Sequence, residues 1–171
     1  AAVTAVQSPA KNTYTRQEVK NFVAYAAARG VAIIPEIDMP GHTTAALAAM
    51  PQLGCTGREV KLATGGGIYK TILCAGKDET LEFARRVVCE AAELFPAPYF
   101  HLGGDEAPKS EWQSCPACGA RLRQQGLASF EDLQGWFTSQ VAAVLKGMGK
   151  TVLCWNDALL ADNLTEDITI Q

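Results

Sequence analysis

The stretch that most constrains this chain is HLGGDE at residues 101–106, which ends an apolar run over 97–102. The aromatic and aliphatic side chains of that run favour a buried strand, and the paired glycines end it. Asp105 and Glu106 then follow at the carboxyl end of the strand, where parallel α/β sheets and barrels build their active sites. The pattern predicts a parallel α/β arrangement with two candidate catalytic carboxylates. In the alternative interpretation, Asp105 caps the next helix and Glu106 is a solvated surface side chain.

A second stretch has the same organisation. PEIDMPGH at residues 35–42 follows the apolar run 31–34 and again places acids and a histidine just beyond a predicted strand. Together, PEIDMPGH and HLGGDE resemble the family 20 glycoside hydrolases, the β-N-acetylhexosaminidases. Trp155, at the end of a later predicted strand, also fits that family. The resemblance extends from about Thr13 to Trp155.

The resemblance implies a (β/α)₈ barrel that removes terminal N-acetylglucosamine or N-acetylgalactosamine with retention, without a metal or a cofactor. Most retaining glycosidases use two carboxylates about 5–5.5 Å apart, usually from different strands, but family 20 is a substrate-assisted exception. There the 2-acetamido oxygen of the substrate attacks the anomeric carbon and forms an oxazolinium intermediate. By resemblance, Glu106 is the general acid and base, and Asp105 orients the acetamido group.

Further residues are expected to support these two. The resemblance assigns His42 and Trp155 to substrate binding, Trp155 as a wall of the sugar pocket, and Asp157 is a candidate contact to a hydroxyl group. His101 lies inside the predicted strand and is expected to be buried beside the acids. Glu36 and Asp38 are expected to play similar supporting roles.

The order of elements predicts consecutive parallel strands with helical crossovers. Helices are expected to begin at the capping box Thr15–Glu18, after Asp78 as an N-cap, and at Ser129. Strands are expected at 31–37, 97–102, 151–155 and 167–171, and long loops at 40–77 and 103–128. A complete barrel needs about 250 residues, so the 171 residues are interpreted as one partial catalytic barrel domain, residues 1–171, containing the central strands.

Six cysteines are present, at positions 55, 74, 89, 115, 118 and 154. Cys89 falls on the apolar face of a predicted helix and Cys154 inside a predicted strand, where cysteine is commonly a small buried hydrophobe. The CxxC at 115–118 is typical of redox sites or of half a zinc site. Since no second CxxC or paired histidine completes a zinc site, the CxxC is interpreted as structural or incidental, and no metal site is predicted.

The bulk properties exclude some partners. The net charge is −3, and no basic cluster larger than Arg85-Arg86 suggests binding to nucleic acid or to an anionic membrane. No apolar run approaches the roughly 20 residues of a membrane span. The expected partners are a carbohydrate substrate and the rest of the barrel, and the family implies a secreted, periplasmic or lysosomal location.

Two other classes of function remain open. Asp38, His42, His101, Asp105 and Glu106 are residue types that bind divalent metals, which would suit a metal-dependent hydrolase. The chain could also be a non-catalytic carbohydrate-binding segment, because barrel strands are missing from it.

Overall fold

The computed structural model describes residues 13–165 and 167–171, and within them it has a parallel α/β arrangement. The elements are α1 (Arg16–Ala27), α2 (Thr44–Ala49), the 3₁₀ helix η2 (Pro51–Leu53), α3 (Asp78–Leu94), β1 (Tyr99–His101), α4 (Ser110–Gln113), α5 (Pro116–Gln124), α6 (Phe130–Gly147), β2 (Thr151–Cys154), the 3₁₀ helix η3 (Asn156–Leu160) and β3 (Thr169–Ile170). None of the helices in the described ranges has the length and apolar composition needed to span a bilayer.

The sheet is parallel and its strands follow the chain in the order β1-β2-β3. Phe100 is paired with Val152, and Leu153 with Thr169. The segment predicted as a strand at 31–37 is extended but makes only one parallel bridge, between Glu36 and His101. It therefore lies at the free edge of β1, and it is too sparsely paired among the described residues to form a full strand.

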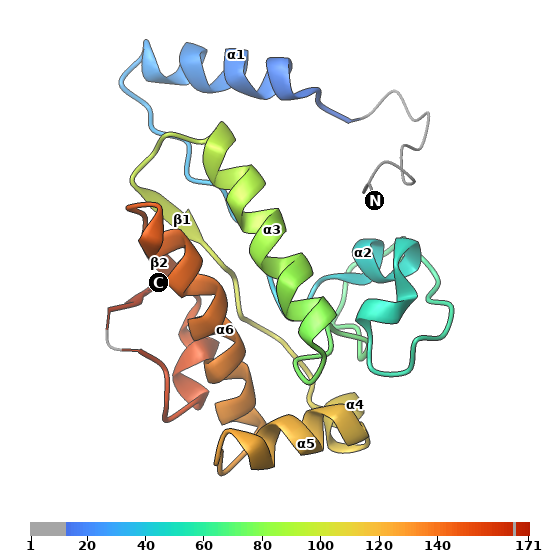
Figure 1. The fold of residues 1–171 in the computed structure, drawn as a ribbon. Helices are drawn as coiled ribbons and strands as arrows, with labels where there is room; N and C mark the ends of the chain where they lie inside the picture. Colours follow the sequence, from blue (N-terminus) through green and yellow to red (C-terminus); the bar gives the residue numbers. More distant parts are fainter. Residues whose placement is uncertain (1–12, 166) are drawn as a thin grey trace.

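Helices α3 and α6 lie side by side over one face of the sheet (Figure 1). This follows from their sequences, because each has apolar side chains at helical spacing. The core between these helices and the strands is fully buried and includes Ala84, Val88, Phe100, Leu133, Phe137, Val141, Leu145 and Val152. The sheet, with the carboxyl ends of its strands, is thus held in place by a closely packed core.

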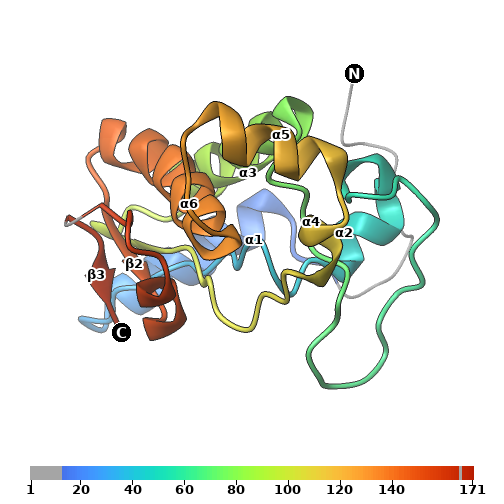
Figure 2. The ribbon, with the colours of Figure 1, turned by 90° about the horizontal axis from the view of Figure 1, so that it is seen from below.

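The helix starts were largely predicted. Thr15 and Ser129 form complete capping boxes with Glu18 and Asp132, as expected, whereas the N-cap of α3 is Lys77 instead of Asp78. The region 103–128, expected to be a loop, contains the helices α4 and α5. Both pack against the distant segment before α3, α4 through Trp112 on Leu73 and α5 through Cys118 on Cys74. The predicted 40–77 connection contains α2 and η2, and in Figure 2 these lie on the opposite side of the molecule from β2 and β3.

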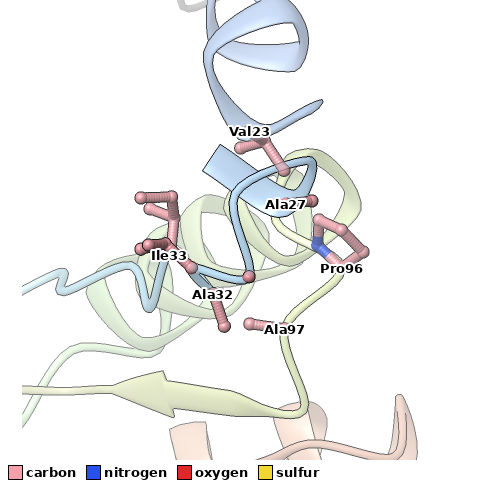
Figure 3. A pocket seen from close by; sticks show the side chains of 8 residues that line it. Val23, Ala27, Ala32, Ile33, Pro96 and Ala97 are labelled. Atoms are coloured by element: carbon pink, nitrogen blue, oxygen red, sulfur yellow. The ribbon is translucent and has the colours of Figure 1, made fainter. Parts of the chain in front are cut away.

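Helix α1 departs from its predicted burial. Helical spacing predicts an inward face of Val19, Phe22, Val23, Ala26 and Ala27 for this helix. Only Ala26 of these is buried, and Phe22 is 57% exposed. Figure 3 shows the apolar opening beneath the helix, where Val23 and Ala27 face Ala32, Pro96 and other apolar side chains. The inward face was predicted from helical spacing alone, and spacing does not show whether a neighbouring layer is present to cover that face.

Trp112 ties α4 to the long connection before α3. The side chain is fully buried, and its indole Nε1–H donates a hydrogen bond to the carbonyl oxygen of Leu73 at 2.8 Å. The same carbonyl cannot reach water, so the indole is its partner in place of solvent. Trp112 thereby fixes the segment that leaves the HLGGDE stretch.

We expect Trp112→Phe to lower the free energy of unfolding by about 2 kcal/mol or more, because it leaves the buried Leu73 carbonyl unpaired as well as a small cavity. Trp136→Phe, on the partly exposed face of α6, is the matched control and should cost less. Denaturant unfolding of both variants measures the difference. Equal losses in the two variants would contradict this account of the Trp112 hydrogen bond.

Candidate functional site

The candidate site is built around the turn at Gly103 and Gly104. Both glycines have positive φ, +65° and +97°. A Cβ placed on Gly103 would lie only 1.9 Å from Oδ1 of Asp38, and the Gly104 N–H donates to that same oxygen at 2.8 Å. The turn therefore needs glycine both for its backbone conformation and because the Asp38 carboxylate occupies the space beside it.

Two more side chains hold the turn from the other side. The amide nitrogen of Gln134, buried on α6, donates to the Gly104 carbonyl at 2.6 Å. The Glu106 N–H donates to Oδ2 of Asp157 at 3.0 Å. Glu106 itself has φ +47°, an uncommon conformation for a residue with a side chain. The backbone that carries the two acids is thus fixed by contacts from three separate segments.

His42 faces the carboxylates. Its Nε2 lies 3.4 Å from Oε2 of Glu106, 3.6 Å from Oδ2 of Asp105 and 3.9 Å from Oδ2 of Asp38. His42 also has a positive φ, +52°, in the turn that follows the cis Met39–Pro40 bond. At the neighbouring Gly41, an added Cβ would lie 3.0 Å from the Asp105 carbonyl oxygen. The two motif stretches are therefore in direct contact.

The carboxyl groups differ in their surroundings. Burial raises the pKa of Asp38 to about 7, against the opposing hydrogen bond from Gly104. Asp105 is partly buried, and its Oδ1 has no solvent contact and no hydrogen-bond partner among the described residues. The side chain of Glu106 is 47% exposed. Asp105 therefore offers a sheltered acceptor beside a more accessible neighbour.

Trp155 closes one side of the site. Its indole N–H donates to Oε1 of Glu36 at 2.9 Å, and its ring is tilted against that of His101 with centroids 4.7 Å apart. His101 is buried, and Nδ1 accepts a hydrogen bond from the Gly103 N–H, which places the ring proton on Nε2. Burial lowers the pKa of His101, which favours the neutral ring. Glu36 thus positions the indole, and His101 supports both the turn and Trp155.

Every residue predicted from sequence lies in this one region, although some make other contacts than expected. His101 bonds the glycine turn and not the acids, and Asp157 holds the Glu106 backbone, while its contact to a sugar stays a prediction. Asp105 does not cap the next helix, since the N-cap of α4 is Lys109. Gln134 was missed; the available signal was a polar residue among the apolar positions of the 130–147 helix.

One subset of these residues has the spacing to hold a cation. Asp38, His42 and Asp105 each offer one ligand atom, and these three atoms lie within 4.8 Å of one another. Exposed acidic groups commonly lie this close together without an ion.

The chain is similar to known proteins both in its sequence and in its structure. Residues 2–171 match the family model described as "Glycosyl hydrolase family 20, catalytic domain". A β-hexosaminidase of Porphyromonas gingivalis is 44% identical over 157 residues, covering 92% of this chain and 20% of that protein. The chain therefore spans about a fifth of the length of this relative.

Solved structures agree. The crystal structure of β-N-acetylhexosaminidase from Bacteroides fragilis has a TM-score of 0.83 and 43% identity, covering 92% of this chain and 31% of that chain. An exo-β-N-acetylglucosaminidase from Vibrio harveyi, solved in complex with N-acetylglucosamine, has a TM-score of 0.79 and 34% identity. The match covers 92% of this chain and 25% of that chain. The partial α/β arrangement of the chain thus corresponds to part of a larger domain in these proteins.

We expect Gly103→Ala to be far more disruptive than Gly126→Ala. Both glycines have φ +65°, but an added Cβ at Gly126 meets nothing within 4 Å, whereas at Gly103 it meets Asp38. Alanine in this conformation costs about 1–2 kcal/mol at either position, and only Gly103→Ala adds the collision. Thermal unfolding of the two variants measures the difference. A similar loss in both would show that Asp38 does not constrain the turn.

Proposed function

Because the chain belongs to glycosyl hydrolase family 20, we propose that the protein hydrolyses terminal non-reducing N-acetyl-β-D-hexosamine residues with retention of configuration. The observation that carries the proposal is the pair Asp105 and Glu106, adjacent in the chain and held with different exposure. The Asp105 carboxylate is partly exposed, at 29%, and its Oδ1 has no hydrogen-bond partner in the described ranges. It suits an N–H donor on the substrate, which the 2-acetamido group supplies.

The proposed reaction has two steps. Glu106 donates a proton to the departing glycosidic oxygen while the acetamido carbonyl oxygen attacks the anomeric carbon, and the C–O bond to the leaving group breaks. Asp105 holds the acetamido N–H and stabilises the positive charge that grows on it in the oxazolinium ion. Glu106, now a carboxylate, then takes a proton from water as that water attacks the anomeric carbon and reopens the ring.

The surrounding residues suit these roles. His42 lies within 4 Å of both acids and is placed to orient them or to donate to a sugar hydroxyl. Trp155 presents a flat apolar ring, held by Glu36 and His101, against which a sugar face or an acetamido methyl group can pack. This wall adds binding without interfering with the proton transfers.

The chain is proposed to be part of a catalytic barrel whose remaining strands complete the pocket. Two observations support this: the chain spans only a fifth of the length of the Porphyromonas relative, and the apolar face of α1 is largely uncovered. The substrate is proposed to be a carbohydrate ending in an N-acetylhexosamine.

The proposed function is tested by release of a chromophore from an aryl N-acetyl-β-glucosaminide, with the matching aryl β-glucoside as the control. The protein should cleave only the N-acetyl substrate, because the glucoside lacks the internal nucleophile. Equal cleavage of both substrates, or cleavage of neither, would contradict the substrate-assisted mechanism.

We expect Glu106→Gln to lower kcat/KM by about 10²–10⁴-fold on a substrate with a poor leaving group, because protonation of that oxygen is lost. The loss should be much smaller when the leaving group is a nitrophenolate that needs no proton. Glu93→Gln, at an exposed position near the C-terminal end of α3, is the matched control and should retain activity. A Glu106→Gln enzyme that keeps full activity on the poor leaving group would rule out the acid role.

A further inference from the structure

Four cysteines far apart in the sequence meet on the side of the molecule formed by α2, α4 and α5. Cys115 and Cys118 belong to the CxxC motif at the start of α5, whereas Cys55 and Cys74 come from the long connection before α3. Their four sulfur atoms lie within 4.8 Å of one another. None of these residues takes part in the candidate active site.

The spacing of the sulfur atoms is that of a metal site. The Sγ–Sγ distance is 3.5 Å for Cys74–Cys118 and 3.8 Å for both Cys55–Cys118 and Cys74–Cys115. Four thiolates around one zinc ion at about 2.3 Å form a tetrahedron with edges of about 3.8 Å. We propose that Cys55, Cys74, Cys115 and Cys118 bind one structural zinc ion.

The fold builds this cluster through backbone contacts close to each cysteine. Gly54 and Leu73 form an antiparallel bridge, and the Cys74 N–H donates to the Leu53 carbonyl at 2.9 Å, which sets Cys55 beside Cys74. Gly76 packs so tightly that an added Cβ would lie 2.3 Å from the Cys118 nitrogen. The connection is thereby pressed against the first turn of α5.

The surroundings also suit a tetrathiolate. A bound zinc with four thiolates has a net charge of −2, and two cations lie near it: Lys77 donates to the Gly54 carbonyl at 2.7 Å, and Arg121 to the Gly76 carbonyl at 3.5 Å. Cys74, Cys115 and Cys118 are buried, while Cys55 is partly exposed. A surface pocket lined by Cys55 and Cys115 gives an ion a route of entry.

Other chemistries fit less well. A disulfide needs two sulfurs about 2.05 Å apart, whereas the Sγ–Sγ distances here are 3.5–3.8 Å, and the shortest of them joins Cys74 to Cys118 across the two possible pairs. The sulfurs are also too close together to enclose a cluster of several iron and sulfide ions. All-sulfur tetrahedral donors favour zinc or iron among common metals. Elemental analysis distinguishes these two metals.

The first test is elemental analysis of the full-length protein, purified under reducing conditions without a metal-affinity tag. We expect about one zinc per chain. Cys118→Ser should lose the zinc, and Cys89→Ser, on α3 outside the cluster, is the matched control and should keep it. Absence of zinc from the wild type, iron in its place, or full retention by Cys118→Ser would overturn the proposal.

A second measurement does not depend on the variants folding. The wild-type protein is stripped of metal under reducing conditions and titrated with cobalt(II). Thiolate-to-cobalt charge-transfer bands and the visible absorption of tetrahedral cobalt should saturate at about one equivalent, and the Tm should rise. Absence of these bands, or no saturation near one equivalent of cobalt, would overturn the proposal.

Discussion

The candidate site depends on the contact between the Asp38 carboxylate and the glycine turn. Asp38 accepts the Gly104 N–H and fills the space that any side chain at Gly103 would need. The contact joins the two motif stretches and determines where the chain goes next. The directions of Asp105 and Glu106 follow from it, since both acids continue directly from this turn. The geometry of the candidate site is therefore a consequence of backbone packing more than of contacts between the acids themselves.

This arrangement explains why adjacent carboxylates can do different work. Gln134 holds the Gly104 carbonyl and Asp157 holds the Glu106 N–H, so the backbone is fixed on either side of Asp105. Neighbouring side chains on a fixed turn diverge, which leaves Asp105 sheltered and Glu106 accessible. A preorganised site of this kind would not need to be rearranged when charge develops during the proposed reaction.

The sequence predicted those features that local patterns encode. The HLGGDE turn, the capping boxes at Thr15 and Ser129, and the strand order all follow from short stretches, and the structure confirms them. Features that depend on distant partners were missed. The meeting of Cys55 and Cys74 with the CxxC requires two segments to fold together, and α4 is stabilised by a carbonyl 39 residues away through Trp112. The exposure of Phe22 depends on what covers α1, which helical spacing does not reveal.

The acids and the thiol cluster are also physically connected. The segment that leaves Glu106 runs into α4, where Trp112 bonds the Leu73 carbonyl, and then to Cys115. Cys74 follows Leu73 directly, so the hydrogen bond and the thiols fasten the same two segments to each other. A zinc ion at the four sulfurs would stabilise that junction against local unfolding. Its ligands come from the stretches around Cys55, around Cys74 and at the CxxC, and all three must be in place for the ion to bind. The loop that follows the acids would then be fixed at both of its ends, by the glycine turn at one and by the metal at the other.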